Sequence, residues 1–334
     1  MRLLITGASG MLGQDVQRAA AGHEVLALAR AELDITDATA TQRTVRDVAP
    51  DVIINCAAWT NVDLAESAEA DAFATNSAGA ENMARAALAA RALIIHISSD
   101  YVFDGRKGQP YVESDPPQPL SVYGRSKLAG EEGVARQAPG MHTIVRSAWL
   151  FGAGGPCFPA TMMRLARERG ELKVVDDQIG SPTFTGHLAR ALIELAQRPA
   201  LGLVHVAGSG ACSWFELARE VIARSGLAAE IAPTTTDQMP RPAPRPSYSA
   251  LTTERPNEVP RLPDWREGVD EFLQAAVQSG PRRKSHRIRA VPGGAWRRPR
   301  SLAYLPGTPR ELRPCQSPPV PSLGATGLTT ETTS

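Results

Sequence analysis

Cysteine pairs and long apolar runs are both missing from this 334-residue sequence. The four cysteines lie far apart, at Cys56, Cys157, Cys212 and Cys315, so no C-x-x-C pair is available for zinc or for a redox disulfide. We expect these thiols to be buried or incidental. The apolar runs, such as residues 93–97, are much shorter than the ~20 residues that a membrane-spanning helix needs. We therefore expect no zinc centre of this kind and no membrane span.

An extreme composition and a secretory signal are missing as well. Hydrophobic residues make up 43% and charged residues 21% of the chain, which is ordinary for a globular enzyme and unlike disordered or collagen-like proteins. Residues 1–7 hold a short apolar stretch before a glycine, without the longer apolar region or cleavage site of a signal peptide. We expect a cytoplasmic protein with one large α/β domain or two small ones, and no membrane partner.

The near-zero net charge of the chain averages two different segments. Residues 281–334 contain ten Lys or Arg against two Asp or Glu, and nine of the 27 prolines. No helical or alternating apolar period runs through this segment, so we expect a disordered, basic, Pro-rich tail without a catalytic role. Such a tail can bind nucleic acid or an acidic surface. A solvated extension is the simpler interpretation, and we expect no nucleic-acid partner.

Apolar strand-like runs alternate with Ala-rich helical stretches through the first half of the chain. This alternation is typical of a doubly wound parallel sheet, so residues 1–150 are predicted to form an NAD(P)-binding domain of the Rossmann type. The expected strands are 3–6, 25–29, 52–55, 93–98 and 143–146, and the expected helices follow residue 10 and lie near 39–48, 68–90 and 122–136.

The pattern becomes less regular after residue 146. Residues 151–280 are predicted to form a smaller, helix-rich substrate-binding portion, with one later strand from 151–210 joining the first domain. The expected helices lie near 158–169, 184–197, 213–225 and 265–278, with strand-like runs at 173–175 and 204–206. Pro and Thr dominate residues 233–263, which we expect to be mostly irregular and to fold over a site.

Three glycines, Gly7, Gly10 and Gly13, separate the first strand from the first helix. A glycine turn at this place lets the backbone approach a diphosphate while the helix N-terminus points its N–H groups at it. The spacing is G-x-x-G-x-x-G instead of G-x-G-x-x-G. A dinucleotide is the expected ligand, and the residues expected to contact it are Gly7, Ser9, Gly10, Met11, Leu12, Arg30, Asp34, Ile35, Ala57, Ala58, Tyr123 and Lys127.

Charged residues after the second strand bear on the choice of cofactor. An acidic side chain there, such as Asp34, can hold the adenosine ribose, whereas a cation can meet the 2′-phosphate of NADPH. Arg30 favours NADPH over NADH. A solvated Arg30 without this role is the alternative.

Tyr123 and Lys127 lie four residues apart in a predicted helix, so they project from one face. A phenol titrates near pH ~10, and we expect the ammonium and the nicotinamide charge to lower the pKa of Tyr123. Ser99 directly follows the strand at 93–98, at the carboxyl end where ligands bind in such sheets. Ser99, Tyr123 and Lys127 are therefore the predicted catalytic residues.

This constellation resembles the extended short-chain dehydrogenase/reductase superfamily and, within it, the dTDP-4-dehydrorhamnose reductase family. The resemblance covers roughly residues 1–275. The stretches that carry the resemblance are 55–63 (NCAAWTNVD), 98–105 (SSDYVFDG), 122–131 (VYGRSKLAGE), 146–149 (RSAW) and 177–183 (DQIGSPT). Ser99 stands at a position where the family often has Thr.

The resemblance implies NAD(P)H-dependent reduction of the C4 ketone of dTDP-4-dehydro-β-L-rhamnose (dTDP-4-dehydro-6-deoxy-L-lyxo-hexose), the last step of dTDP-L-rhamnose synthesis. Tyr123 would protonate the C4 oxygen, Lys127 would hold the nicotinamide ribose, and Ser99 would polarise the ketone. The implied substrate-binding residues are Asn61, Val62, Asp63, Ser99, Asp100, Tyr101, Trp149, Gln178 and Arg245.

Simpler roles stay open for several of these residues. Asn61 and Asp63 fit the start of a helix, Trp149 fits a core or rim aromatic, and Arg245 fits a solvent-exposed loop. The family also includes dimers bridged by Mg²⁺, and Asp15 matches one ligand position. The helix dipole favours a carboxylate there without any metal, so no metal is predicted, and a homodimer is one assembly that the resemblance allows.

Two other functions remain as alternatives. A related nucleotide-sugar epimerase or dehydratase shares the glycine turn and the Tyr–Lys pair, but the run at 177–183 argues against it. A non-catalytic NADP-binding subunit, similar to the β subunit of methionine adenosyltransferase, keeps the cofactor fold. The intact Ser99, Tyr123 and Lys127 argue against that one.

Overall fold

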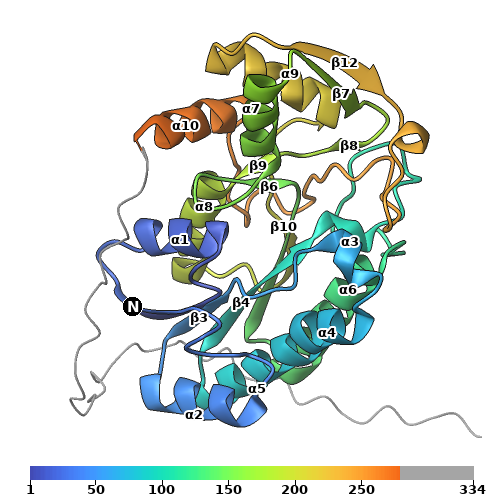
Figure 1. Cartoon of the computed structure of the whole chain (residues 1–334). Coiled ribbons are helices and arrows are strands. Elements are labelled where there is room, and N and C mark those ends of the chain that lie inside the picture. The colour runs from blue at the N-terminus through green and yellow to red at the C-terminus, as the bar shows by residue number, and fades with distance from the viewer. Residues whose placement is uncertain (279–334) are drawn as a thin grey trace, which may run out of the picture. The chain divides into compact units, whose positions relative to one another are not determined.

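Six parallel strands form the central sheet of the computed structural model, which describes residues 1–278 (Figure 1). Their spatial order is β10-β5-β4-β3-β1-β2, which confirms the predicted doubly wound sheet. The chain reverses its winding between β1 and β3, where such sheets bind ligands at the carboxyl ends of the strands. The strands are β1 (Arg2–Thr6), β2 (Glu24–Leu28), β3 (Val52–Asn55), β4 (Leu93–Ser99), β5 (His142–Ser147) and β10 (Gly202–His205).

Helices cover both faces of this sheet (Figure 1). On one face α1 (Met11–Ala19) and α8 (Thr185–Gln197) pack through Val16 and Leu188 against Leu3 and Ile5 of β1. On the other face α2 (Ala38–Val48), α5 (Ala80–Ala90) and α6 (Val122–Gln137) share a core with Leu4. Because successive strand residues point to opposite faces, the unbroken apolar run of β1 contributes side chains to the cores on both faces of the sheet.

The helix predicted over residues 68–90 is divided into three parts. It consists of α4 (Glu69–Phe73), the π-helical turn η1 (Ala74–Gly79) and α5. Asn76, in the π turn, accepts a hydrogen bond from the Trp59 N–H at 2.8 Å and donates one to the Ser126 hydroxyl at 2.9 Å. These long-range bonds tie the turn to α6 and to the loop after β3, so tertiary contacts stabilise the departure from a regular helix.

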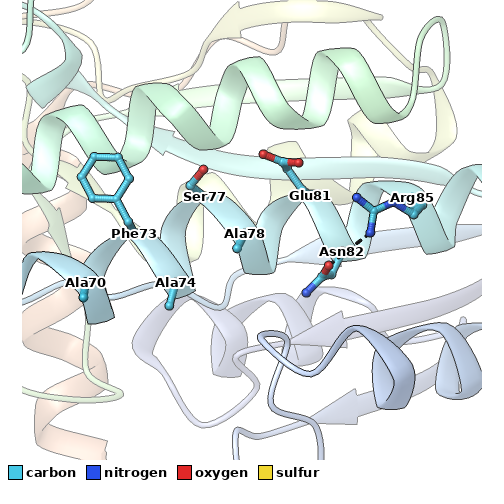
Figure 2. A pocket seen from close by; sticks show the side chains of 8 residues that line it. All are labelled: Ala70, Phe73, Ala74, Ser77, Ala78, Glu81, Asn82 and Arg85. Carbon is cyan, nitrogen blue, oxygen red and sulfur yellow. Dashed lines mark hydrogen bonds between the residues drawn. The ribbon is translucent and has the colours of Figure 1, made fainter.

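The same helical segment carries a surface pocket of about 360 Å³ (Figure 2). Small side chains repeat along it at a helical spacing, and Arg85 donates a hydrogen bond to Asn82 at 3.4 Å. None of the predicted site residues lines this pocket, so it does not enter the candidate site. The lining residues are Ala70, Phe73, Ala74, Ser77, Ala78, Glu81, Asn82 and Arg85.

The residues after β5 add helices and short strand pairs at the carboxyl edge of the sheet (Figure 1). Helices α7 (Phe158–Glu168), α9 (Trp214–Ser225) and α10 (Trp265–Gln278) match the predicted ranges within a residue or two. The pairs are β7 (Glu171–Val175) with β12 (Glu230–Thr234), β8 (Ile179–Gly180) with β11 (Cys212–Ser213), and β6 (Leu150–Phe151) with β9 (Thr183–Phe184).

Some of these elements were absent from the prediction. Strand β12 was not expected, because its partner β7 lies far away in the sequence. The remaining elements are short: α3 (Val62–Ala65) and the 3₁₀ turns η2 (Asp100–Val102) and η3 (Thr236–Gln238). No helix within residues 1–278 is both long and apolar enough to cross a bilayer. The predicted tail, residues 281–334, lies outside the described residues.

Candidate functional site

The turn after β1 requires glycine for two reasons. Gly7 has a φ of +66°, a backbone conformation that residues with a Cβ atom rarely adopt. A Cβ atom on Gly7 would also lie 2.6 Å from the carbonyl carbon of Cys56 and 2.7 Å from the nitrogen of Ala57. The glycine turn and the loop after β3 therefore touch at the crossover point of the sheet.

The next two glycines leave space for different partners. A Cβ atom on Gly13 would lie 2.3 Å from the carbonyl oxygen of Gly7, so Gly13 permits close packing of α1 on the turn. A Cβ atom on Gly10 would meet only that same oxygen, at 3.3 Å, so its remaining surroundings are open. Gly10 is the N-cap residue of α1, and no side-chain hydrogen bond caps this helix end. This open backbone at an uncapped helix N-terminus fits a diphosphate.

The other residues expected around the diphosphate have different exposures. Ser9 is exposed and Met11 is half-buried at the start of α1. Leu12 is buried in the core beneath the sheet, so it offers only its backbone to a ligand. Ala57 and Ala58 are half-buried, and the Ala57 N–H donates to the side chain of Asn55 at 3.3 Å.

The loop after β2 holds Arg30 and Asp34 as an ion pair of 3.3 Å. The Arg30 side chain is 76% exposed, so both its proposed role toward a 2′-phosphate and its solvated alternative fit this position. Hydrogen bonds from the backbone and side chain of Thr36 lower the pKa of Asp34. Ile35 is buried, and a Cβ atom on Gly79 would lie 2.7 Å from its side chain.

Ser99, at the end of β4, lies beside Tyr123 of α6. The Ser99 hydroxyl donates to a carboxylate oxygen of Asp100 at 3.0 Å and accepts the Tyr101 N–H at 3.2 Å. Removal of water by the surrounding protein raises the pKa of Tyr123 to about 12, although a hydrogen bond with Ser99 lowers it. The structure thus brings two of the predicted catalytic residues together.

The predicted lowering of the Tyr123 pKa is wrong for the protein's own groups. Burial raises this pKa and the charge of Asp100 raises it further, while no contribution from Lys127 offsets them. The Lys127 ammonium instead donates to the carbonyl oxygen of Ile97 at 2.6 Å. Tyr123 is therefore a protonated phenol across the neutral range.

Lys127 is almost completely buried, with 2% of its surface exposed. Burial lowers its pKa to about 8, although the charge of Glu131 and the neighbouring Cys56 act to raise it. Because the backbone of Cys56 also packs against Gly7, Lys127 lies at the same edge of the sheet as the glycine turn. Lys127 thus lies near the glycine turn, and Tyr123, one helical turn earlier in α6, lies beside Ser99.

A buried ion pair begins one helical turn after Lys127 in α6, and the sequence analysis did not single it out. The guanidinium of Arg146 donates two hydrogen bonds to the carboxylate of Glu131, at 2.8 and 2.6 Å, and both side chains are buried. The Ser98 hydroxyl donates to the same carboxylate at 2.5 Å. Glu131 stands four residues after Lys127, and this spacing was the one available sequence signal.

The substrate side joins three of the predicted residues. Arg245 donates to a carboxylate oxygen of Asp63 at 2.9 Å, and it also hydrogen-bonds with Tyr101. Partial burial works to raise the pKa of Asp63, but Arg245 and the Ala243 N–H outweigh it and the pKa is lowered. The irregular segment over residues 233–263 thus contacts α3, the short helix that follows β3.

Asn61 and Asp100 already have protein partners. The Asn61 side chain accepts the Leu64 N–H at 3.0 Å, as the simpler capping interpretation predicts, and Val62 is half-buried in the same short helix. The second carboxylate oxygen of Asp100 accepts the Ser249 hydroxyl at 2.6 Å. Burial raises the pKa of Asp100 to about 7.

Trp149 and Gln178 meet through a residue that the sequence analysis missed. The indole of Trp149 stacks on Trp214, with ring centroids 3.5 Å apart. The Trp214 N–H donates to the Gln178 side-chain oxygen at 3.1 Å, and the Gln178 amide donates to the Thr236 hydroxyl at 2.9 Å. No sequence signal marked Trp214, because it lies within an ordinary amphipathic helix.

Asp15 is held by neighbouring side chains. Its carboxylate accepts the Thr185 hydroxyl at 2.5 Å and pairs with Arg18. In the part of the chain that the structure describes, no three His, Cys, Asp or Glu side chains are grouped as a metal site. The expectation of no metal stays a prediction.

The combination of this sheet, the glycine turn and a Ser–Tyr–Lys group at its carboxyl edge defines a class of protein. The chain is a short-chain dehydrogenase/reductase of the extended type, since residues beyond the sheet build a second side to the site. The family model described as RmlD substrate binding domain matches residues 1–278. The chain therefore belongs to this family.

Individual relatives agree with this assignment. A dTDP-4-dehydrorhamnose reductase of Mycolicibacterium smegmatis is 44% identical over 286 residues, 83% of this chain and 86% of the relative. A spore coat polysaccharide biosynthesis protein of Bacillus subtilis is 41% identical, with 82% and 97% covered. The crystal structure of dTDP-4-dehydrorhamnose reductase from Bacillus anthracis in complex with NADP has a TM-score of 0.80 at 37% identity, with 82% and 99% covered. The predicted resemblance is confirmed.

Proposed function

We propose that this chain catalyses the NADPH-dependent reduction of the C4 ketone of dTDP-4-dehydro-β-L-rhamnose to dTDP-L-rhamnose. The observation that carries the proposal is that Ser99 lies beside Tyr123, with the buried Lys127 one helical turn further along α6 and near the glycine turn, in a member of this family. NADPH is preferred to NADH because Arg30 offers a cation near the expected adenosine ribose and because a related structure contains NADP.

The cofactor site is proposed to consist of the open backbone at Gly10 and the start of α1 for the diphosphate, with Lys127 at the nicotinamide ribose. When bound there, NADPH supplies the hydride that reduces the C4 carbon. Asp34 and Arg30 would lie toward the adenosine end.

Tyr123 holds the proton that the C4 oxygen needs. With a pKa raised to about 12, its phenol is protonated at neutral pH and can donate through its O–H. Ser99 donates a second hydrogen bond to the same oxygen by turning its hydroxyl away from Asp100. The Lys127 ammonium, which donates to the Ile97 carbonyl, is proposed to hold the nicotinamide ribose and so to position the cofactor beside Tyr123.

The sugar nucleotide is proposed to bind on the side of Asp63, Tyr101 and Arg245. Arg245 suits a diphosphate because its planar guanidinium matches two oxygens at once. Residues 151–280 are proposed as the substrate-binding portion, with 1–150 as the cofactor domain. A homodimer and a cytoplasmic location stay predictions.

Turnover with the purified substrate tests the proposal. The expected result is loss of the absorbance of NADPH only when the dTDP-linked 4-keto sugar is present, with dTDP-L-rhamnose as product by mass and NMR. An epimerase would convert the sugar without consuming NADPH, and a regulatory subunit would bind NADPH without turnover. Either result would overturn the proposal.

A further inference from the structure

Trp149, which joins β5 to β6, has an unusual backbone conformation. Its φ is +47°, in the left-handed region that bulky residues rarely adopt. Such a conformation persists only where the surroundings hold it in place, and it is most frequent at functional sites. The contacts of its indole ring must therefore hold this conformation in place.

One face of the Trp149 ring is covered by Trp214. The two indoles are parallel within 3°, with centroids 3.5 Å apart. Trp214 is itself fixed, because its N–H donates to Gln178 at 3.1 Å and its ring packs 4.6 Å from that of Phe158. Trp214 thus presents a rigid flat surface to Trp149.

The opposite face is covered by the backbone of Gly180. A Cβ atom on Gly180 would lie 2.3 Å from Cε2 of Trp149 and 2.6 Å from both Cζ2 and Nε1, which are two of the three atoms bonded to Cε2. Since the middle atom is the closest, this position lies over the ring face and not at its edge. It cannot lie between the two indoles, because atoms of Trp214 would then be nearest to it.

The two covering segments are joined to each other. Strands β8 and β11 pair so that Gly180 lies opposite Cys212, two residues before Trp214. The Ser213 hydroxyl donates to Asp176 at 2.5 Å and also caps α9. A short ladder therefore sets the spacing between the segments that enclose the indole of Trp149.

We propose that Trp214 and Gly180 form a clamp that presents Trp149 to the sugar nucleotide edge-on. With both faces covered, the half-buried ring offers its rim, which carries the indole N–H. Trp214 is thus a positioning residue that acts through Trp149. This inference rests on the proposed function and on the predicted role of Trp149 as a substrate-binding residue, two positions after Ser147, which lies opposite Ser99 in the sheet.

Trp214→Ala and Trp214→Phe test the clamp. We expect Trp214→Ala to raise the KM for the sugar nucleotide ten- to a hundredfold, roughly, because Trp149 loses its support. Trp214→Phe keeps an aromatic face and should recover most of this loss. The Kd for NADPH should change less than about twofold in both variants. Phe215→Leu, a change of the next aromatic along α9, is the matched control and should leave the KM unchanged.

Circular dichroism of the free protein measures the clamp without substrate. Two stacked indoles give an exciton couplet in the far ultraviolet, and Trp149→Phe and Trp214→Phe should each remove it, whereas Phe215→Leu should retain it. A couplet that survives either tryptophan change, or a KM within about twofold of wild type in Trp214→Ala, would overturn the inference. Absence of turnover in the wild-type protein would instead overturn the proposed function, while the couplet would still report the clamp.

Discussion

The catalytic side of the site comes from neighbouring segments of the chain, whereas its substrate side comes from segments that are far apart in the chain. Ser99 ends β4, and Tyr123 and Lys127 lie in α6, the next long helix. Asp63 and Arg245, in contrast, are separated by 182 positions. This comparison teaches that a sequence motif can contain the chemistry of a site while its specificity depends on how distant loops meet.

The difference also predicts two kinds of damage. Changes on the catalytic side should lower kcat and leave binding intact, because these side chains are held by buried helix and strand ends. Changes on the substrate side should mainly raise KM, because they release a loop that positions the sugar nucleotide.

Tyr123→Phe should have the largest effect. Removing the phenolic proton while keeping the ring is expected to lower kcat by about 10²- to 10⁴-fold, the usual contribution of a positioned general acid. NADPH binding, measured by fluorescence titration, should remain within about twofold of wild type. A variant that kept wild-type kcat would remove Tyr123 as the proton donor.

Arg245→Ala should have the next largest effect. Loss of a charge-assisted partner is worth about 1.5–3 kcal/mol, so the KM for the sugar nucleotide should rise roughly ten- to a hundredfold. Arg245→Lys should recover part of this loss, because it keeps the charge without the planar fork. A KM that rose equally for NADPH would mean that the loop contacts the cofactor and not the substrate.

The Lys127 ammonium should impose a pH limit on the catalytic side. Its pKa is lowered to about 8, so the charged form is present below that pH and is lost above it. The value of kcat/KM, which reports the free enzyme, should therefore fall about tenfold per pH unit above pH ~8.

Glu131→Gln sharpens this test. The charge of Glu131 raises the pKa of Lys127, so its removal should move the alkaline limb of the profile to lower pH. The amide keeps the shape of the side chain and part of its bonding to Arg146. If the alkaline limb stayed at its wild-type pH in this variant, the titration of Lys127 would not be the cause of the pH limit.

Arg30→Ala should have the smallest effect. The side chain is mostly exposed and its ion pair with Asp34 is a surface contact, so we expect only a few-fold loss of NADPH affinity. The affinity for NADH should not change. Equal losses for both cofactors would show that Arg30 acts on something other than the 2′-phosphate.

Several elements could be predicted because their signals are local. Strand β3 matches the predicted 52–55, and the glycine turn lies where the spacing of Gly7, Gly10 and Gly13 placed it. These predictions rest on side-chain periodicity and on the conformational freedom of glycine, which depend only on residues a few positions apart.

Other features depended on distant partners. The π turn at Asn76 interrupts a segment whose sequence is typical of a continuous helix, because Trp59 and Ser126 bind the Asn76 side chain. Likewise, the pKa of Tyr123 depends on burial that no helical spacing indicates.

By itself, the sequence determined the parallel sheet, the glycine turn and the identity of the Ser–Tyr–Lys group, because each is encoded over a few neighbouring residues. Only the tertiary structure decided that Glu131 pairs with Arg146, that Arg245 reaches Asp63, and that Trp214 covers Trp149. The physical reason is that such contacts form between side chains brought together by the packing of whole elements, and periodicity within one element carries no information about the residue opposite it.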